Sequence, residues 1–233
     1  MKEQLQYFGY AISEDLYNRA GSNIQKTLSG DINAALVEEI TNTLIHITDI
    51  GLQAYYQRPR DLIEISPVVK KAADAGINAV MKGVHIVVRK VIQRAPETEL
   101  QKMALYMKSL LTMDDNGNHY ITFQLNHELY SLSQELLERV RVDSDVDTYR
   151  EDIVEALFQL IDAGIDAYYH QPVGMIDLGK LTKKTADVGI RTAQKGTNSV
   201  IKRVFKVLDH EEMVPLTRYF ESLLHSNLSS YNH

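Results

Sequence analysis

Apolar residues recur every three or four positions along most of this chain, which is the spacing of one face of an α-helix. In the first half, Ile40, Leu44, Ile47 and Gly51 follow this spacing towards Pro59. Because proline lacks an amide donor and restricts the residue before it, Pro59 is expected to end that helix. The same periodicity predicts further helices from about residue 14, over about 66–93 and over about 97–111.

Two short segments have a different pattern. Residues 7–12 and 120–125 are rich in aromatic and branched side chains and alternate weakly, which favours β-strands. Ser13 and Asn126 follow these segments in the position of a helix N-cap. A single strand leaves backbone groups unpaired, so the two segments are expected to pair with each other.

The whole order of patterns occurs twice. Tyr7 aligns with Tyr120, and the offset of 120 − 7 = 113 continues without a gap to the end of residues 111 and 224. Such a self-match indicates a duplicated structural unit. We therefore predict an all-α fold of two tandem four-helix units related by a pseudo-twofold axis, with at most one short strand at the start of each. The expected units are residues 1–112 and 120–233, joined by a linker, 113–119, that is rich in turn formers.

Composition narrows the class of protein. The chain has no cysteine, which excludes disulfides, thiolate zinc sites and a cysteine nucleophile. A net charge of −6 does not suit a general nucleic-acid binder, so no nucleic-acid partner is expected. No apolar run has the length of a signal peptide or a membrane span, and a cytoplasmic location is expected.

Known catalytic and metal-binding motifs are absent from the sequence. It contains no His-Glu-x-x-His, Glu-x-x-His or Gly-x-Ser-x-Gly, and no phosphate-binding loop. No histidine has a histidine counterpart in the other copy, and the acidic stretch 209–212 is interpreted as the first turn of a helix. We expect no metal, no cofactor and no enzymatic activity.

Glycines inside the predicted helices need a reason, because each costs about 1 kcal/mol relative to alanine. Gly51, Gly76 and Gly83 all have glycine counterparts in the second copy. The favoured explanation is close packing between two helices. The alternative is that the small residues leave room for a ligand.

A group of residues kept in both copies forms the candidate site. In an antiparallel helical hairpin, two tyrosines at the end of one helix approach two lysines and an aspartate at the start of the next. Hydroxyls, ammonium groups and helix N-terminal amides can hold an anionic ligand. The competing interpretation is that these side chains seal helix ends. The candidate residues are Tyr55, Tyr56, Lys70, Lys71, Asp74, Tyr168, Tyr169, Lys183, Lys184 and Asp187.

These observations favour a non-enzymatic binding or adaptor protein that presents two similar helical faces to a protein partner. The alternative is a regulatory protein that binds a small anionic ligand or a lipid at the repeated tyrosine, lysine and aspartate cluster. Residues 76–93, with Lys82 and Arg89 on a polar side, also fit a helix lying on a membrane. A core helix with a solvated face has the same pattern and the chain is acidic overall, so a membrane partner is not expected.

Overall fold

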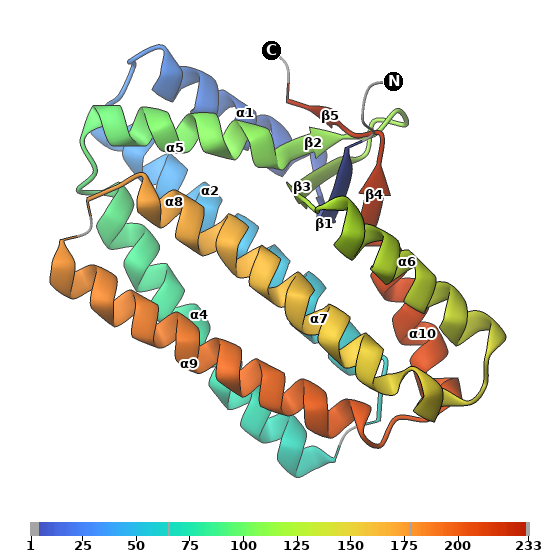
Figure 1. The fold of residues 1–233 in the computed structure, drawn as a ribbon. Coiled ribbons are helices and arrows are strands. Elements are labelled where there is room, and N and C mark those ends of the chain that lie inside the picture. Colours follow the sequence, from blue (N-terminus) through green and yellow to red (C-terminus); the bar gives the residue numbers. More distant parts are fainter. Residues whose placement is uncertain (1–4, 65, 178, 232–233) are drawn as a thin grey trace.

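The computed structural model describes residues 5–64, 66–177 and 179–231. The protein is mostly helical, as predicted, but it also contains a five-stranded antiparallel sheet where at most two strands were expected. The sheet lies on one side of the molecule, and the two longest helices lie on the opposite side (Figure 1).

The same kinds of element follow one another in both halves of the chain, apart from one short turn and the last strand. The first half contains β1 (Gln6–Ile12), α1 (Glu14–Leu28), α2 (Ala34–Leu52), the π-helical turn η1 (Gln53–Gln57), α3 (Arg58–Asp61), α4 (Pro67–Ile92), α5 (Glu97–Leu110) and β2 (Leu111–Met113). The second contains β3 (His119–Gln124), α6 (His127–Val142), the 3₁₀ turn η2 (Val146–Thr148), α7 (Arg150–Ile165), the π-helical turn η3 (Asp166–His170), α8 (Gln171–Gly174), α9 (Lys180–Phe205), α10 (His210–Glu221), β4 (Leu224–Ser226) and β5 (Ser229–Ser230).

The sheet joins the two halves of the chain. Its strand order is β4-β1-β3-β2-β5, so β1 of the first half pairs with β4 of the second, and β3 of the second half pairs with β2 of the first. The predicted pairing of β1 with β3 is confirmed, and it is antiparallel. One of its six pairs joins Gly9 and Thr122, whose numbers differ by 122 − 9 = 113.

Helix starts follow the capping residues in the sequence. The side chains of Ser13 and Asn126 accept hydrogen bonds from the amides of Leu16 and Leu129, at 3.2 and 2.8 Å. Asp209 and Glu212 form a capping box at α10, which confirms that this acidic stretch is a helix start.

Pro59 does not end its helix, contrary to expectation. The chain passes through the π-helical turn η1, in which the Arg58 amide donates to the Gln53 carbonyl, and helical structure then continues to Asp61. Pro59 lies in the first turn of α3, where its missing donor is tolerated.

The apolar core is shared between the halves. One buried cluster contains Val91, Ile92 and Leu100 of the first half, and Ile176 of the second half packs against it. The residue equivalent to Ile176 is Ile63, since 176 − 63 = 113, and Ile63 packs against the second half's buried cluster. Each half therefore supplies an apolar side chain to the core of the other.

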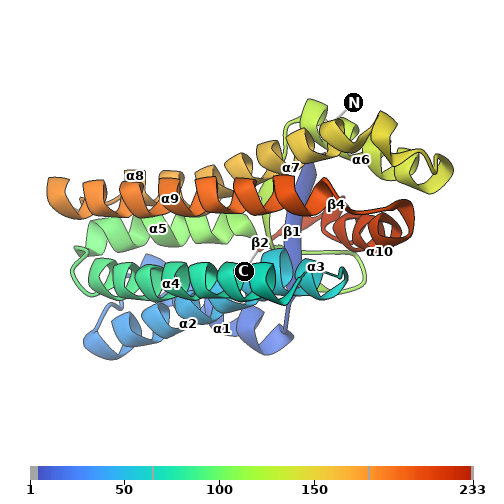
Figure 2. The same ribbon diagram turned by 90° about the horizontal axis from the view of Figure 1, so that it is seen from below.

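Helices α4 and α9 form an outer layer. They contact each other and pack over α2 and α7, and both lie in front in the view of Figure 2. Among the described side chains of residues 67–90 and 183–203, none is buried, and burial begins only at Val91 and Val204. This layer therefore exposes much of its length to solvent.

The glycines of this outer layer do not serve close packing, and that expectation was wrong for α4 and α9. A methyl group built at Gly76, Gly83, Gly189 or Gly196 meets no atom within 4 Å, and all four residues are exposed. Gly51 is closely packed, but against β1 rather than a second helix, since the added carbon would lie 2.9 Å from the Tyr10 hydroxyl oxygen.

His225 makes the sheet sensitive to acid. Its ring lies 4.4 Å from that of Tyr120, and its Nε2 is buried without a hydrogen-bond partner among the described residues. Burial lowers the pKa of His225 below its ordinary 6.5. The unfolded chain therefore binds a proton more readily, and this contribution to stability is present above about pH 6.5 and lost as the pH falls.

We expect the free energy of unfolding, measured in urea at pH 8 and pH 5.5, to fall less in His225→Phe than in the wild type. The exposed His170 provides the matched variant His170→Gln, which should keep the wild-type dependence. Equal pH dependence in all three proteins would show that burial of His225 is not the cause.

Candidate functional site

Tyr55 and Tyr168 lie in the core between the halves, away from the lysines with which they were grouped. Their hydroxyl oxygens are 3.3 Å apart, and their rings pack on Phe8 and Phe123. Burial raises the pKa of both hydroxyls well above 10, so both stay protonated. This position favours packing rather than ligand binding for these two residues.

The π-helical turns explain why both copies keep alanine, tyrosine and proline at fixed spacing. The Arg58 amide donates to the Gln53 carbonyl. Pro59, the next residue, has no amide that could donate to the Ala54 carbonyl. The Ala54 carbonyl is instead satisfied by the hydroxyl of Tyr219, which donates to it at 2.7 Å.

The second half makes the reciprocal contact. The Tyr106 hydroxyl donates to the Ala167 carbonyl, also at 2.7 Å. Both donor and acceptor are related to the first contact by 113 residues, since 219 − 106 and 167 − 54 give the same number. Burial raises the pKa of Tyr106 to about 12, so the hydroxyl stays protonated and able to donate.

Removing either hydroxyl should leave a carbonyl unpaired. We expect Tyr106→Phe and Tyr219→Phe each to lower the free energy of unfolding by about 1–3 kcal/mol, and by similar amounts. Urea unfolding measures this. Tyr7→Phe is the control, because Tyr7 is buried and its hydroxyl has no hydrogen bond among the described residues. If all three variants match the wild type within about 0.5 kcal/mol, the two contacts contribute no more than ordinary surface groups.

The second tyrosine of each copy meets the predicted aspartate. Tyr56 donates to Asp74 and Tyr169 to Asp187, each at 2.9 Å. Burial and the hydrogen bond to Asp74 raise the pKa of Tyr56 to about 12, while the same hydrogen bond lowers the pKa of Asp74. These pairs anchor the start of α4 and α9 to the preceding π-helical turns.

In the first copy, two carboxylates form ion pairs with cations of the cluster. Arg60 forms ion pairs with Asp74 and with Asp61, the latter at 2.7 Å, and Lys70 lies 3.6 Å from Asp61. Lys71 is exposed. Arg60 and Asp61 are not among the residues that both copies share, because the 113-residue offset places Val173 and Gly174 opposite them.

In the second copy the cluster stays basic. A surface hollow of about 360 Å³ is lined by Lys183, Lys184, Asp187, Val188 and Arg191. Three of these side chains are cationic and one is acidic, and the Tyr169 hydroxyl donates to that carboxylate. The two copies therefore differ in electrostatics, although they keep the same tyrosine and aspartate.

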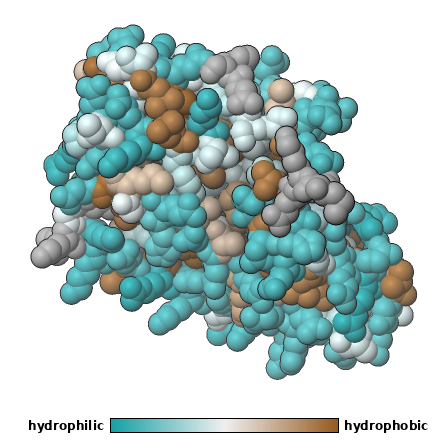
Figure 3. Space-filling model, turned by 45° about the horizontal axis from the view of Figure 1, so that its top comes forward, coloured by the Kyte–Doolittle hydropathy of each residue, from teal (hydrophilic) through white to brown (hydrophobic). Residues whose placement is uncertain are grey.

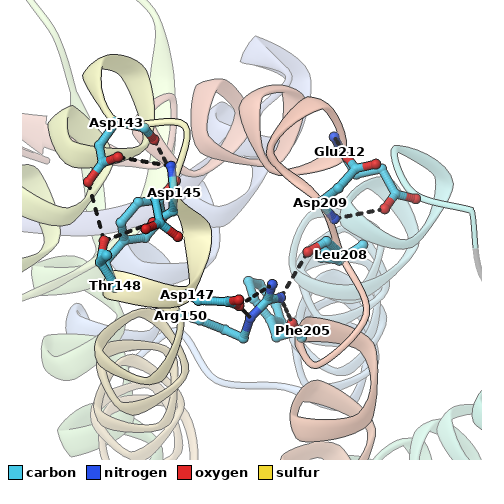
Figure 4. A network of polar contacts seen from close by, with 10 residues as sticks. Asp143, Asp145, Asp147, Thr148, Arg150, Phe205, Leu208, Asp209 and Glu212 are labelled. Atoms are coloured by element: carbon cyan, nitrogen blue, oxygen red, sulfur yellow. Dashed lines mark hydrogen bonds and ion pairs between the residues drawn. The ribbon is translucent and has the colours of Figure 1, made fainter.

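An acidic loop before α7 has a structural role (Figure 4). Asp143 accepts hydrogen bonds from the Asp145 amide and the Thr148 hydroxyl. Arg150 pairs with Asp147 and donates to the Leu208 carbonyl at 2.8 Å, which ties this loop to the α9–α10 connection. Within the part of the chain that the structure describes, no three histidine, aspartate or glutamate side chains gather as a metal site would require.

A small apolar cavity lies in the second half of the chain. It has a volume of about 60 Å³ between α6, α7 and α10, and its hydroxyl groups, those of Ser133 and Thr217, donate to carbonyls of their own helices. Small-molecule sites usually occupy roughly 300–1,000 Å³. This cavity is therefore a packing defect rather than a binding site.

Basic residues are concentrated on the outer layer. α4 and α9 contain 12 of the chain's 25 lysine and arginine residues but only 2 of its 31 aspartates and glutamates. The remaining residues have 13 cations against 29 acidic groups, a net charge of −16. We call the exposed side of these helices the α4–α9 face, which carries Lys71, Gly76, Lys82, Gly83, Ile86, Arg89, Lys90, Lys184, Val188, Gly189, Arg191, Lys195, Gly196, Lys202 and Arg203.

The side of the molecule that bears the sheet is mainly hydrophilic, and its hydrophobic side chains form scattered groups (Figure 3). Leu28 and Leu105 are exposed on α1 and α5. Isolated apolar residues of this kind are normal on protein surfaces.

No helix in the described residues is both long enough and apolar enough to cross a membrane. Comparison with protein-family models, with curated proteins and with solved structures gave no match to this chain.

Proposed function

We propose that this protein is a non-enzymatic binding module, built like a fused homodimer of two helical units, that docks a protein partner on its α4–α9 face. The observation that carries this proposal is the separation of charge. Nearly half of the lysines and arginines lie on two solvent-exposed helices of an acidic chain. Complementary charge steers association and helps to select partners.

The fused-homodimer part rests on reciprocal contacts. Tyr55 meets Tyr168, and the Tyr106 and Tyr219 hydroxyls bind carbonyls of the opposite halves. In a twofold interface, residue i contacts j and the equivalent of j contacts the equivalent of i. Residues 7–111 and 120–224 are therefore expected to superpose, with residues 113–119 as the boundary between them.

A photo-crosslinking experiment tests the docking surface. The full-length protein would carry a photoreactive amino acid at Ile86 or Val188 on the α4–α9 face, or at Leu105 or Val142 elsewhere; all four are exposed. We expect protein crosslinks in cell extract from the first two positions only. Equal crosslinking from all four positions, or none from Ile86 and Val188, would contradict the proposal.

The basic hollow at Lys183 supports a second candidate function, the binding of a small anionic ligand. If this is correct, inorganic pyrophosphate should raise the melting temperature of the wild type, and Lys183→Met should remove the shift. Lys70→Met serves as the matched variant, since Lys70 is already paired with Asp61. An unchanged melting temperature of the wild type would leave docking as the better proposal.

A further inference from the structure

Four exposed glycines lie on α4 and α9, and among the described residues no atom lies within 4 Å of a Cβ built at any of them. Each lies inside a helix, where glycine is less favourable than alanine, and each would accept a methyl group without contact. Gly76 and Gly83 are separated by seven residues, as are Gly189 and Gly196, so each pair lies on one side of its helix, two turns apart. The space beside these glycines is therefore open to solvent.

Cations lie beside the glycines on both helices. On α4, Lys90 lies within the exposed strip formed by Gly76, Gly83 and Ile86, and Lys82 borders this strip on one side. On α9, Arg203 lies in line with Gly189 and Gly196, and Lys195 and Arg191 border them on one side. Each helix thus presents a small-residue strip with cations within it and along one border.

We infer that the occupant of the α4–α9 face is an acidic amphipathic helix of another protein; this inference rests on the proposed function. Small residues let a second helix approach closely, and its acidic side chains would meet the cations within and beside the strip. The charge imbalance of the face, not the glycines alone, determines the sign of the partner.

Other occupants fit less well. A second copy of this chain bound through the same face would bring two strongly basic surfaces together. Membrane-surface helices insert bulky apolar residues, whereas the exposed apolar residues described on α4 and α9 are chiefly Val68, Ile86 and Val188. Nucleic acid would contact the cations but would leave the small-residue strip without a function.

Binding to synthetic peptides tests this inference on the full-length protein. The probe is a fluorescent amphipathic peptide with alanine and leucine on one side and glutamate on its flanks, and fluorescence anisotropy measures its Kd. A scrambled peptide of the same length and net charge, with a central proline that breaks the helix, is the control for helical shape. We expect the helical peptide to bind at least about tenfold more tightly than the scrambled one.

Paired charge reversals locate the site. Arg191→Glu with Lys195→Glu should weaken binding at least about tenfold. The matched control, Lys102→Glu with Arg218→Glu, reverses two exposed cations on α5 and α10 and should leave Kd unchanged. Gly76→Leu with Gly189→Leu, which adds bulk without changing charge, should also weaken binding.

Several outcomes would overturn the inference. If the scrambled peptide binds equally well, the partner need not be a helix. If both charge-reversal variants lose binding equally, the α4–α9 face is not the binding site. Tighter binding to phosphatidylserine vesicles or to duplex DNA would assign the face to those partners instead. If no probe binds but crosslinking from Ile86 and Val188 still succeeds, the docking proposal stands and the acidic-helix inference fails.

Discussion

Replacing Gly9 with alanine is expected to lower the free energy of unfolding by about 3 kcal/mol or more, at the upper end of overpacking effects. The added carbon would lie 2.2 Å from the Ile121 carbonyl oxygen and 2.7 Å from the Thr122 Cα. Both atoms belong to the backbone of β3, so β1 and β3 must separate to make room. Because this pair joins the two halves of the chain, the damage should reach the whole fold.

Urea unfolding of Gly9→Ala measures the effect, and two other glycines supply controls. At Gly21 the added carbon meets the Tyr231 ring at 2.3 Å, so that a side chain rather than the backbone would have to shift. At Gly164 the nearest contact is 3.7 Å from Phe123, an ordinary separation. Gly21→Ala should therefore cost much less than Gly9→Ala, and Gly164→Ala should be neutral or stabilising. Similar stability in all three variants would show that β1 and β3 are not in close contact at Gly9.

The sequence predicted those parts of the fold that depend on local patterns. The spacing of Ile40, Leu44 and Ile47 predicted the second helix of the unit, and Ser13 and Asn126 predicted two helix starts. A single strand leaves its backbone groups unpaired, and this requirement predicted the pairing of β1 with β3. These features follow from neighbouring residues or from one general requirement of backbone hydrogen bonding.

Long-range contacts explain what was missed. β2 and β4 each contain three residues and continue directly from the pattern of a helix, so nothing local marks Leu111 as the start of a strand. Pro59 was expected to end a helix because the hydroxyl that satisfies the Ala54 carbonyl comes from Tyr219, far along the chain. Elements that depend on contacts with the other half of the molecule cannot be predicted from the residues of one segment alone.

The candidate site was predicted in part. The helical hairpin brought Tyr56 to Asp74 and Tyr169 to Asp187, as expected, because both contacts lie within one unit. Tyr55 was placed wrongly, since adjacent residues on a helix point in different directions and its ring faces the other half. Arg60 occurs only in the first copy, so it is not among the residues that both copies share.

Replacing all four exposed glycines, Gly76, Gly83, Gly189 and Gly196, with alanine is expected to stabilise the protein by roughly 2–4 kcal/mol, at about 0.5–1 kcal/mol per position. Alanine restricts the unfolded chain and favours the helix, and the structure offers no clash at any of the four positions. Urea unfolding would show a higher midpoint with an unchanged slope.

A gain in stability would mean that the fold alone does not account for glycine at these positions. Gly51→Ala is the matched control, because there the added carbon lies 2.9 Å from the Tyr10 hydroxyl oxygen and should destabilise the protein. If the four-alanine variant is less stable than the wild type, the glycines pack against other parts of the chain and the α4–α9 face is not open. If it is more stable and also binds the acidic helical peptide more weakly, the glycines serve the approach of a partner at a cost in stability, as binding surfaces commonly do.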